Sequence, residues 1–267
     1  MKAGKEARTR CNLGQYENHD VVNSYRNSQS LQNPEISVLR RIEEEFRGKR
    51  ILDIGVGTGR TTPALLEISN DYVGIDAASS MISVCRSKFP TVLFEIRDAR
   101  DLSAYGDCVF DLVFFSFNGL DTVDHTGRFE ALGEIHRVLT DGGAFVFSTH
   151  NLRGTINKPW NLPTVPWRIN PLRRPRYFSR ETMKFTMNTF NHIRNRRHEE
   201  WNDGFAIVND QAHSYRLLHY YVNIETQVGQ LTEIGFHSIE PVDLSGRWLS
   251  EDAFRCKDTW IYYLCRK

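Results

Sequence analysis

Residues 51–60, ILDIGVGTGR, constrain the fold more than any other stretch of this chain. A short apolar run predicts a buried strand, and three glycines follow it at alternate positions: Gly55, Gly57 and Gly59. Glycine after a strand lets a ligand approach the main chain closely. The segment therefore predicts a ligand-binding turn at the carboxyl end of a strand.

Two familiar nucleotide-binding turns do not match this segment. The dinucleotide fingerprint GxGxxG needs a third glycine where this chain has Arg60, and the phosphate-binding loop GxxxxGK[ST] is absent. Two acids accompany the turn, because Asp53 precedes it and Asp76 ends the next predicted strand. In doubly wound folds, a carboxylate at the end of the second strand, as Asp76 is here, binds ribose hydroxyls. Asp53 is expected to face a cationic amino group. A ligand with a ribose and an amino acid would use both acids.

The rest of the chain alternates short apolar runs with helical patterns. Strands are predicted at 50–55, 71–76, 91–98, 109–117, 143–150, 237–244 and 259–266, and helices at 31–49, 79–89, 128–139, 179–201 and 223–236. Asn33 is expected to cap the first of these helices, and Asn223 and Gly235 to bound the last. Apolar strands separated by helices favour an α/β fold with a Rossmann-like, doubly wound, mostly parallel seven-stranded sheet.

The alternation stops after residue 150, where five of the nine prolines fall within 157–178. The segment 151–222 combines this loop, one helix and a predicted hairpin at 205–222, so we interpret it as an inserted α+β cap. The expected organisation is an N-terminal helical lid at 1–49, a cofactor-binding core at 50–150, the substrate cap at 151–222, and completion of the core sheet by 223–267.

Composition indicates an ordinary soluble protein, with 40% hydrophobic and 25% charged residues. No apolar run approaches the roughly 18 residues that cross a bilayer, and residues 1–10 lack the apolar stretch of a secretory signal, so a cytoplasmic protein with no membrane partner is expected. The five cysteines are scattered, which predicts neither a disulfide framework nor a metal site.

Positive charge gathers in one segment, although the formal net charge is only +1. Between residues 153 and 197 the single acid is Glu181, and the basic residues are Arg153, Lys158, Arg168, Arg173, Arg174, Arg176, Arg180, Lys184, Arg194, Arg196 and Arg197. This basic cap would suit an anionic metabolite or a phosphate backbone, or it is a solvated face.

Five motifs in order make the sequence resemble the class I S-adenosylmethionine-dependent methyltransferases. They are ILDIGVGTGR, VGIDAASSMI, IRDARDL, VFDLVFFSFNGLD and EIHRVLTDGGAFVFSTHN. Asp141 departs from the family, which usually has proline before the paired glycines. The resemblance implies S-adenosylmethionine as cofactor, with S-adenosylhomocysteine as product.

The resemblance also implies which residues bind the cofactor. Gly55 and Gly57 would lie behind the methionine part, Asp76 with Ala77 at the ribose, and Met81 on the adenine face. Other implied residues flank the adenine or the methionine: Asp98, Ala99, Arg100, Phe115 and Ser116. An isolated aspartate is commonly a helix cap or turn former, but three at successive strand ends are not explained in that way.

Two further segments are expected to complete the site. In similar enzymes a segment before the first helix of the fold closes over the cofactor, and here Tyr16, Tyr25 and Arg26 would do so, the alternative for the aromatic residues being plain packing. The proposed bases for removing a proton from the acceptor are His150, after the fifth strand, and His219, in the cap.

The residues expected near the acceptor are Asn118 and Tyr221. Capping of the loop is the alternative for His150, aromatic packing is the alternative for His219 and Tyr221, and helix capping is favoured for Asp121 and His125. The favoured function is methyl transfer to a hydroxyl or amine of a small molecule. An RNA methyltransferase and a non-catalytic cofactor-binding protein of the same fold are the alternatives, and nucleic acid is disfavoured by the near-zero net charge. The acceptor and the oligomeric state stay open.

Overall fold

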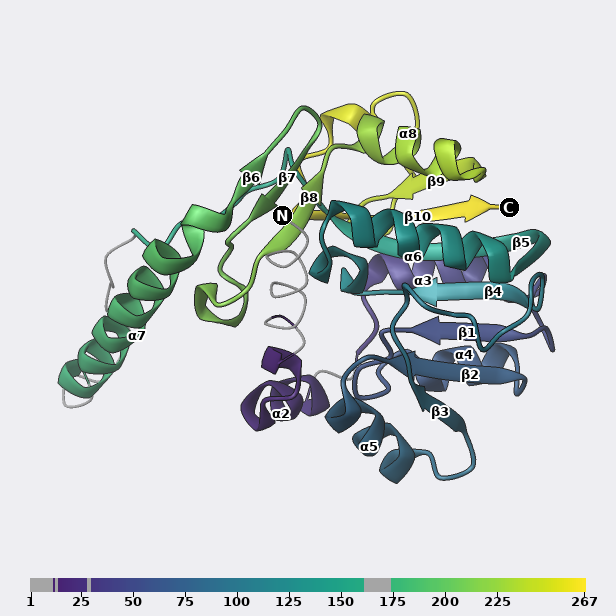
Figure 1. Cartoon of the computed structure of the whole chain (residues 1–267), viewed down its shortest axis with the longest axis horizontal. Coiled ribbons are helices and arrows are strands. Elements are labelled where there is room, and N and C mark those ends of the chain that lie inside the picture. Colours follow the sequence, from purple (N-terminus) through teal and green to yellow (C-terminus); the bar gives the residue numbers. More distant parts are fainter. Residues whose placement is uncertain (1–11, 13, 28–29, 161–173) are drawn as a thin grey trace.

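The computed structural model describes residues 12, 14–27, 30–160 and 174–267. Within them a single ten-stranded sheet runs through the molecule, with helices on both of its faces (Figure 1). The strands are β1 (Ile51–Ile54), β2 (Tyr72–Asp76), β3 (Leu93–Ile96), β4 (Phe110–Phe115), β5 (Leu139–Asn151), β6 (Glu200–Trp201), β7 (Phe205–Val208), β8 (His219–Val222), β9 (His237–Val242) and β10 (Trp260–Arg266).

Seven of these strands form the predicted core. Strands β3, β2, β1, β4 and β5 are parallel neighbours in that order, and β10 pairs antiparallel with both β5 and β9. The order reverses between β1 and β4, and ligands of doubly wound sheets bind at the carboxyl ends of the strands at such a point. The predicted Rossmann-like, mostly parallel fold is confirmed.

The segment predicted as a cap extends the sheet. Strand β8 pairs in parallel with the end of β5, where His150 is opposite Tyr221, and β7 and β6 follow as antiparallel neighbours. The predicted hairpin over 205–222 is present as β7 and β8. As a result, the sheet itself places the end of β5 against residues that lie some seventy positions later in the sequence.

Helices cover both faces of the core. The α-helices are α2 (His19–Asn27), α3 (Asn33–Ile42), α4 (Thr62–Ile68), α5 (Ser79–Lys88), α6 (His125–Val138), α7 (Arg174–Asn195) and α8 (Ile224–Ile234). Apolar residues of α6 and α8 pack with Leu52 and Ile54 on one face, whereas those of α3, α4 and α5 pack with Ile51 on the other. Successive side chains of β1 therefore pack into two separate hydrophobic cores, one on each face of the sheet.

Helix boundaries follow local chemistry. The Asn223 side chain accepts the Thr226 N–H at the start of α8, and Gly235 ends that helix with φ +116°, as predicted. The predicted cap Asn33 is wrong, because Asn33 is already helical and Gln32 is the N-cap of α3 in extended geometry. The Gln32 backbone N–H donates to Glu35 at 2.7 Å, so a glutamate one turn into the helix satisfies this end.

Candidate active site

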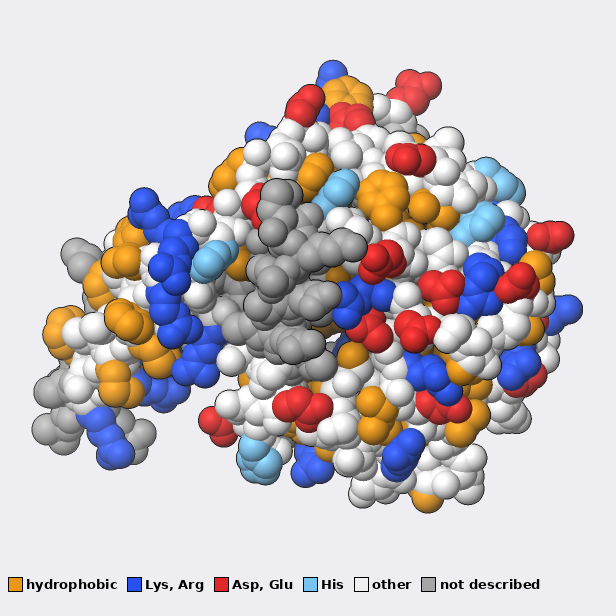
Figure 2. All heavy atoms as spheres, in the orientation of Figure 1, with side chains coloured by type: hydrophobic (Ala, Val, Ile, Leu, Met, Phe, Trp, Pro, Cys, Tyr) orange, Lys and Arg blue, Asp and Glu red, His pale blue; other side chains and the backbone are white. Residues whose placement is uncertain are grey.

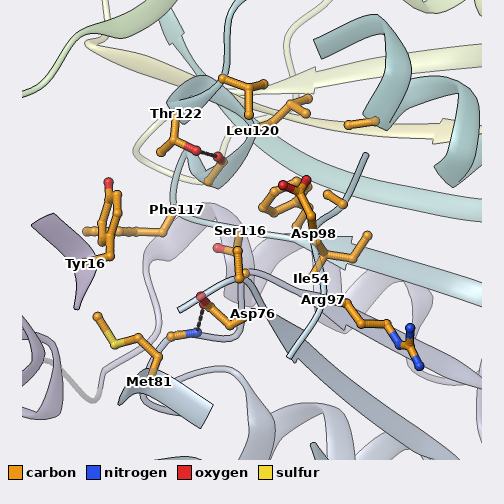
Figure 3. A pocket seen from close by; sticks show the side chains of 18 of the residues that line it. Tyr16, Ile54, Asp76, Met81, Arg97, Asp98, Ser116, Phe117, Leu120 and Thr122 are labelled. Atoms are coloured by element: carbon orange, nitrogen blue, oxygen red, sulfur yellow. Dashed lines mark hydrogen bonds between the residues drawn. The ribbon is translucent and has the colours of Figure 1, made fainter. Parts of the chain in front are cut away.

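A cavity of about 220 Å³ opens at the carboxyl ends of the core strands (Figure 3). Apolar walls come from β1, β4 and the middle of α6, and polar side chains come from the end of β2 and the loop after β3. The lining residues are Asn12, Tyr16, Tyr25, Ile54, Gly55, Gly57, Asp76, Ala77, Met81, Arg97, Asp98, Ala99, Arg100, Phe115, Ser116, Phe117, Gly119, Leu120, Thr122, Val123 and Ala131.

The glycine turn and Asp76 form one unit beside this cavity. The Gly57 N–H donates to Oδ2 of Asp76 at 2.9 Å, and the Ala78 N–H donates to Oδ1 at 2.8 Å. Burial raises the pKa of Asp76 to about 6, although these two N–H groups oppose the shift. A Cβ added at Gly57 would meet only the Gly55 carbonyl, at 4.0 Å, so the turn leaves open space where a side chain would stand.

The loop after β3 brings a second carboxylate to the cavity. Oδ1 of Asp98 accepts the Arg100 backbone N–H and Nε–H, each at 2.9 Å, and Oδ2 accepts from the Arg100 guanidinium at 2.5 Å. Burial would raise the pKa of Asp98, but these hydrogen bonds and the Arg100 charge lower it overall. Met81, from α5, is buried in the opposite wall. The cavity therefore combines an apolar slot with two carboxylates at neighbouring strand ends.

The N-terminal segment lies over one side of the cavity. Tyr16 and Tyr25 line it, and Val22 of α2 packs with Met81 and its neighbours in α5. Glu17 accepts the Ser79 and Ser80 N–H groups at 2.6 and 3.0 Å, which joins this segment to the start of α5. The negative charge of Glu17 at the N-terminus of α5 also interacts favourably with the helix macrodipole.

A buried ion pair supports the floor of the glycine turn. Arg60 donates to both carboxylate oxygens of Glu35, at 2.5 and 2.6 Å, and Glu35 also accepts from Ser116 and Tyr262. Burial opposes ionisation, yet the Arg60 hydrogen bonds and charge lower the pKa of Glu35. The residue that occupies the position of the third dinucleotide glycine thus ties α3 to the turn and to the end of β4.

His150 and Asp121 form a hydrogen-bonded pair next to the cavity. Nδ1 of His150 lies 2.7 Å from Oδ2 of Asp121, and the His150 backbone N–H donates to the same oxygen at 2.7 Å. Burial would raise the pKa of Asp121, but His150 and the Arg128 charge lower it, so the carboxylate is ionised. An ionised carboxylate only accepts hydrogen bonds, so Nδ1 carries a proton. In the neutral ring, Nε2 is therefore left as the acceptor.

This geometry corrects the helix-capping interpretation of Asp121. The residue that caps α6 is Asp124, whose side chain accepts the Gly127 N–H at 2.9 Å. Asp121 is fully buried and also accepts from Arg128 at 2.7 Å and Thr149 at 2.6 Å. His125 does not cap either, because its Nδ1 lies 2.8 Å from the Tyr220 hydroxyl and its ring stacks on Phe205.

A second histidine–aspartate pair lies behind the first. Nδ1 of His219 is 3.0 Å from Oδ2 of Asp210, which also accepts the Tyr221 hydroxyl at 2.8 Å. Burial disfavours the imidazolium, but Asp210 raises the pKa of His219 overall. The Tyr221 and His219 rings lie 4.7 and 5.3 Å from the His150 ring, so the β5–β8 pairing sets the ring of His150 in place.

The loop after β4 links His150 to the cavity. Phe117 and Gly119 line the cavity, and Asn118 between them places Nδ2 3.4 Å from Nε2 of His150. Phe117 and Asn118 have φ angles of 56° and 61°, in the left-handed region. Such a backbone conformation costs free energy in residues other than glycine and is found most often at functional sites. Oδ1 of Asn118 is buried and has no hydrogen-bond partner within the described part of the chain. An unsatisfied buried acceptor there can receive a donor from a ligand.

Known proteins share this architecture. A family model described as a methyltransferase domain matches residues 51–143. The solved structure of an S-adenosylmethionine-dependent methyltransferase from Mesorhizobium loti is similar with a TM-score of 0.57 at 19% identity, over 88% of this chain and 98% of that one. A 1,6-didemethyltoxoflavin-N1-methyltransferase from Burkholderia thailandensis, solved with S-adenosylhomocysteine, gives 0.59 at 13% identity over 99% and 89%.

Residues 51–143 therefore carry a methyltransferase domain, and its fold is that of solved S-adenosylmethionine-dependent methyltransferases. Curated relatives match over part of the chain: a demethylmenaquinone methyltransferase of Renibacterium salmoninarum is 34% identical over 37% of this chain. A ubiquinone biosynthesis O-methyltransferase of Cereibacter sphaeroides is also 34% identical, over 40% of this chain. The chain spans 40% and 43% of the lengths of these two relatives.

Most residues predicted to bind the cofactor line the cavity. They are Tyr16, Tyr25, Gly55, Gly57, Asp76, Ala77, Met81, Asp98, Ala99, Arg100, Phe115 and Ser116. Arg26 is exposed and is not among the lining residues.

Asp53 is also misplaced by the sequence prediction. It lies between Leu52 and Ile54, and alternation turns its side chain to the opposite face of β1, where the Thr61 and Tyr72 hydroxyls donate to it at 2.7 and 2.8 Å. Burial raises its pKa to about 7. Asp53 therefore supports the turn from behind and does not face the cavity.

The residues predicted to lie near an acceptor gather around His150 and do not line the cavity itself. Asn118, Tyr221 and His219 each contact the His150 side chain. Sequence reasoning missed several lining residues, among them Asn12, Arg97, Phe117 and Thr122. Arg97 and Phe117 are next in sequence to the predicted residues Asp98 and Ser116, and could have been predicted on that ground. The sequence around Asn12 gives no indication that it lines a site. No cluster of three or more potential metal ligands occurs among the residues that the structure describes.

Proposed function

We propose that this protein transfers a methyl group from S-adenosylmethionine to a hydroxyl group of a small molecule, with His150 as the general base. The observation that carries the proposal is the Asp121–His150 pair, 2.7 Å apart, at the end of β5 beside the cavity. A buried carboxylate that fixes the tautomer of a histidine is the arrangement of an oriented base.

The cavity residues fit the expected cofactor. Asp76 would accept hydrogen bonds from the ribose hydroxyls, Gly57 would leave room against the main chain, and Met81 would pack on the adenine. The unsatisfied Oδ1 of Asn118, between the lining residues Phe117 and Gly119, would supply an acceptor for a polar donor of the ligand. When bound, the cofactor supplies an electrophilic methyl group on a sulfonium. The protein then has to position the acceptor and remove its proton.

His150 suits oxygen as the acceptor atom. A neutral amine already has a free lone pair, whereas a hydroxyl gains nucleophilicity when a base removes its proton. Nδ1 donates to Asp121, so Nε2 is the atom that would take that proton. The Nε2 atom lies 3.4 Å from Asn118, whose neighbours in sequence line the cavity, so the base and the cofactor site share one loop.

Aromatic side chains connect the base to the cavity and favour a planar acceptor. Trp260 lies 6.3 Å from both the Phe117 and His150 rings, and Tyr25 lies 6.3 Å from Phe117 and stacks on His213 at the same distance. Flat rings offer stacking area to another flat ring. One curated relative is named a ubiquinone biosynthesis O-methyltransferase, which supports a ring hydroxyl as the acceptor class. Another is named a demethylmenaquinone methyltransferase, which supports a ring-bearing acceptor.

Incubation with methyl-labelled cofactor tests the proposal. The protein is mixed with a metabolite extract or with bulk RNA, and label is followed into each fraction. Label in the small-molecule fraction, recovered as an acid-stable methyl ether, supports the proposal. Label only in RNA would replace it with the RNA methyltransferase alternative. Cofactor binding without transfer to either fraction would favour the non-catalytic alternative.

A further inference from the structure

Helix α7 carries an exposed apolar face that the proposed methyl transfer does not use. The helix projects away from the core sheet (Figure 1). Five of its apolar side chains are between 38% and 70% exposed, namely Phe178, Met183, Met187, Phe190 and Ile193. Side chains this large are normally turned inward on a surface helix.

The opposite side of α7 is the one that packs on the protein. Asn191 and His192 are buried, and Asn191 Nδ2 donates to the Ser214 carbonyl at 2.9 Å while His192 Nδ1 lies 2.8 Å from Asn209. The polar side of the helix is therefore turned inward near its end and the apolar side outward. This arrangement is the reverse of an ordinary amphipathic surface helix.

Basic side chains border the apolar face. Arg176, Arg180 and Lys184 follow one another at intervals of four residues, so they run along one side of the helix. Arg194, Arg196 and Arg197 continue the positive charge at its end. Figure 2 shows hydrophobic side chains over α7 beside a row of basic ones.

We propose that α7 lies on the surface of an anionic membrane, with its apolar face among the lipid acyl chains and its basic side chains at the phosphates. A helix with a broad apolar face and a Lys/Arg-rich border binds in this way. The absence of a long apolar run in the sequence led to the expectation of no membrane partner. Within the described residues no helix can span a bilayer, but a helix that lies on the surface does not need that length.

Two other occupants fit α7 less well. RNA bases stack on aromatic side chains, whereas three of the five exposed apolar residues are methionine or isoleucine. In an antiparallel pair of α7 helices the two basic borders would lie on the same side, and like charges disfavour that contact. An anionic bilayer satisfies both the apolar face and the positive border.

Flotation with vesicles tests the proposal on the full-length chain. The protein is mixed with vesicles of phosphatidylcholine alone or with a third of phosphatidylglycerol, and the floated fraction is measured at low and high salt. We expect binding to the anionic vesicles that weakens as salt rises. Equal binding to both vesicle types, or binding to neither, would overturn the proposal.

Matched variants assign the binding to α7. Phe190→Ser with Ile193→Ser should lower binding about tenfold or more, because each lost apolar side chain removes buried area, while Phe254→Ser, an exposed phenylalanine outside α7, should not. Arg180→Gln with Lys184→Gln should lower binding about tenfold or more at low salt, while Lys49→Gln with Lys257→Gln, the same change in charge elsewhere, should not. S-adenosylhomocysteine binding and the melting temperature report whether each variant is folded.

Three results would overturn the α7 assignment. The first is equal loss of vesicle binding in the α7 variants and their controls. The second is tighter binding of a single-stranded RNA than of anionic vesicles, lost in the same α7 variants. The third is a dimer in light scattering that Phe190→Ser with Ile193→Ser converts to a monomer, which would make the face an interface between copies.

Discussion

Oδ2 of Asp121 accepts both the backbone N–H and the ring Nδ1–H of His150, each at 2.7 Å. One carboxylate atom therefore fixes the position of the residue and the tautomer of its ring. The other oxygen accepts from Thr149 and Arg128, so Asp121 cannot turn without breaking buried hydrogen bonds. This relationship holds Nε2 of His150 toward Asn118 and the loop that lines the cavity.

Asp121→Asn should lower the methyl-transfer rate by about 10²- to 10⁴-fold, because an amide can donate to Nδ1 and no longer enforces the productive tautomer. Cofactor affinity should stay within about twofold, measured by calorimetry. The matched control is Asp124→Asn, since asparagine also caps helices and α6 should be kept. Arg128 loses its counter-charge in Asp121→Asn, so melting temperatures must accompany the rates. Unchanged turnover in a folded variant would remove Asp121 from the account.

Asp76→Ala should weaken S-adenosylhomocysteine binding by about 1.5–3 kcal/mol, the value of charge-assisted hydrogen bonds. Calorimetry measures it, with Asp101→Ala, an exposed acid in the loop after β3, as the control. Hydroxyl donors favour the ionised carboxylate, and burial raises the Asp76 pKa to about 6. Affinity should therefore rise as pH increases from 5 to 7 in the wild type. Asp76→Asn should lose this pH dependence, and a variant that keeps it would show that another group is responsible.

Gly57→Val should abolish detectable cofactor binding while most of the fold is kept. The added side chain would enter the open space beside the turn, and φ +56° is strained for valine. Gly133→Ala is the control, because nothing lies within 4 Å of its added Cβ and it is within α6. Near-ultraviolet circular dichroism checks the fold. Normal affinity in Gly57→Val would make the glycine turn a structural feature alone.

The strand ends were predictable from the sequence because the signals are local. An apolar run followed by glycine or aspartate defines β1, β2 and β3, and the parallel order then places Gly57, Asp76 and Asp98 at one edge of the sheet. Asp53 shows where local reasoning stops, since a shift of one residue along a strand turns a side chain to the other face.

The histidine pair needed tertiary information. Asp121 and His150 are 29 residues apart in sequence, and their contact depends on η1 (Gly119–Thr122) folding back on the end of β5. The pairing of β8 with β5 brings His219 and Tyr221 to the same place. The sequence singled out His150, His219 and Tyr221 one by one, but no local pattern predicts which of them are in contact. The polar inner side of α7 is another case, because its partners Asn209 and Ser214 come from the turn between β7 and β8.

Glu35→Gln should destabilise the protein by about 3 kcal/mol in urea unfolding, because Arg60 would be left partly buried without its counter-charge. Glu44→Gln removes an exposed ion pair with Arg47 and should change stability little. The Glu35 pKa is lowered in the fold, so its contribution is present above the unfolded pKa near 4.5 and is lost as pH falls through the lower folded value. The difference between wild type and Glu35→Gln should therefore shrink in acid; a constant difference would exclude the charge as its cause.

The rate of methyl transfer by His150→Ala, on the acceptor identified from the labelled extract, tests the central claim most directly. His237→Ala, an exposed histidine on β9, is the matched control. The account predicts that kcat falls by about 10²- to 10⁴-fold in His150→Ala, with S-adenosylhomocysteine affinity unchanged and the control fully active. Full activity in a folded His150→Ala variant would contradict it, because methyl transfer would then proceed without the base that the Asp121–His150 pair holds in place.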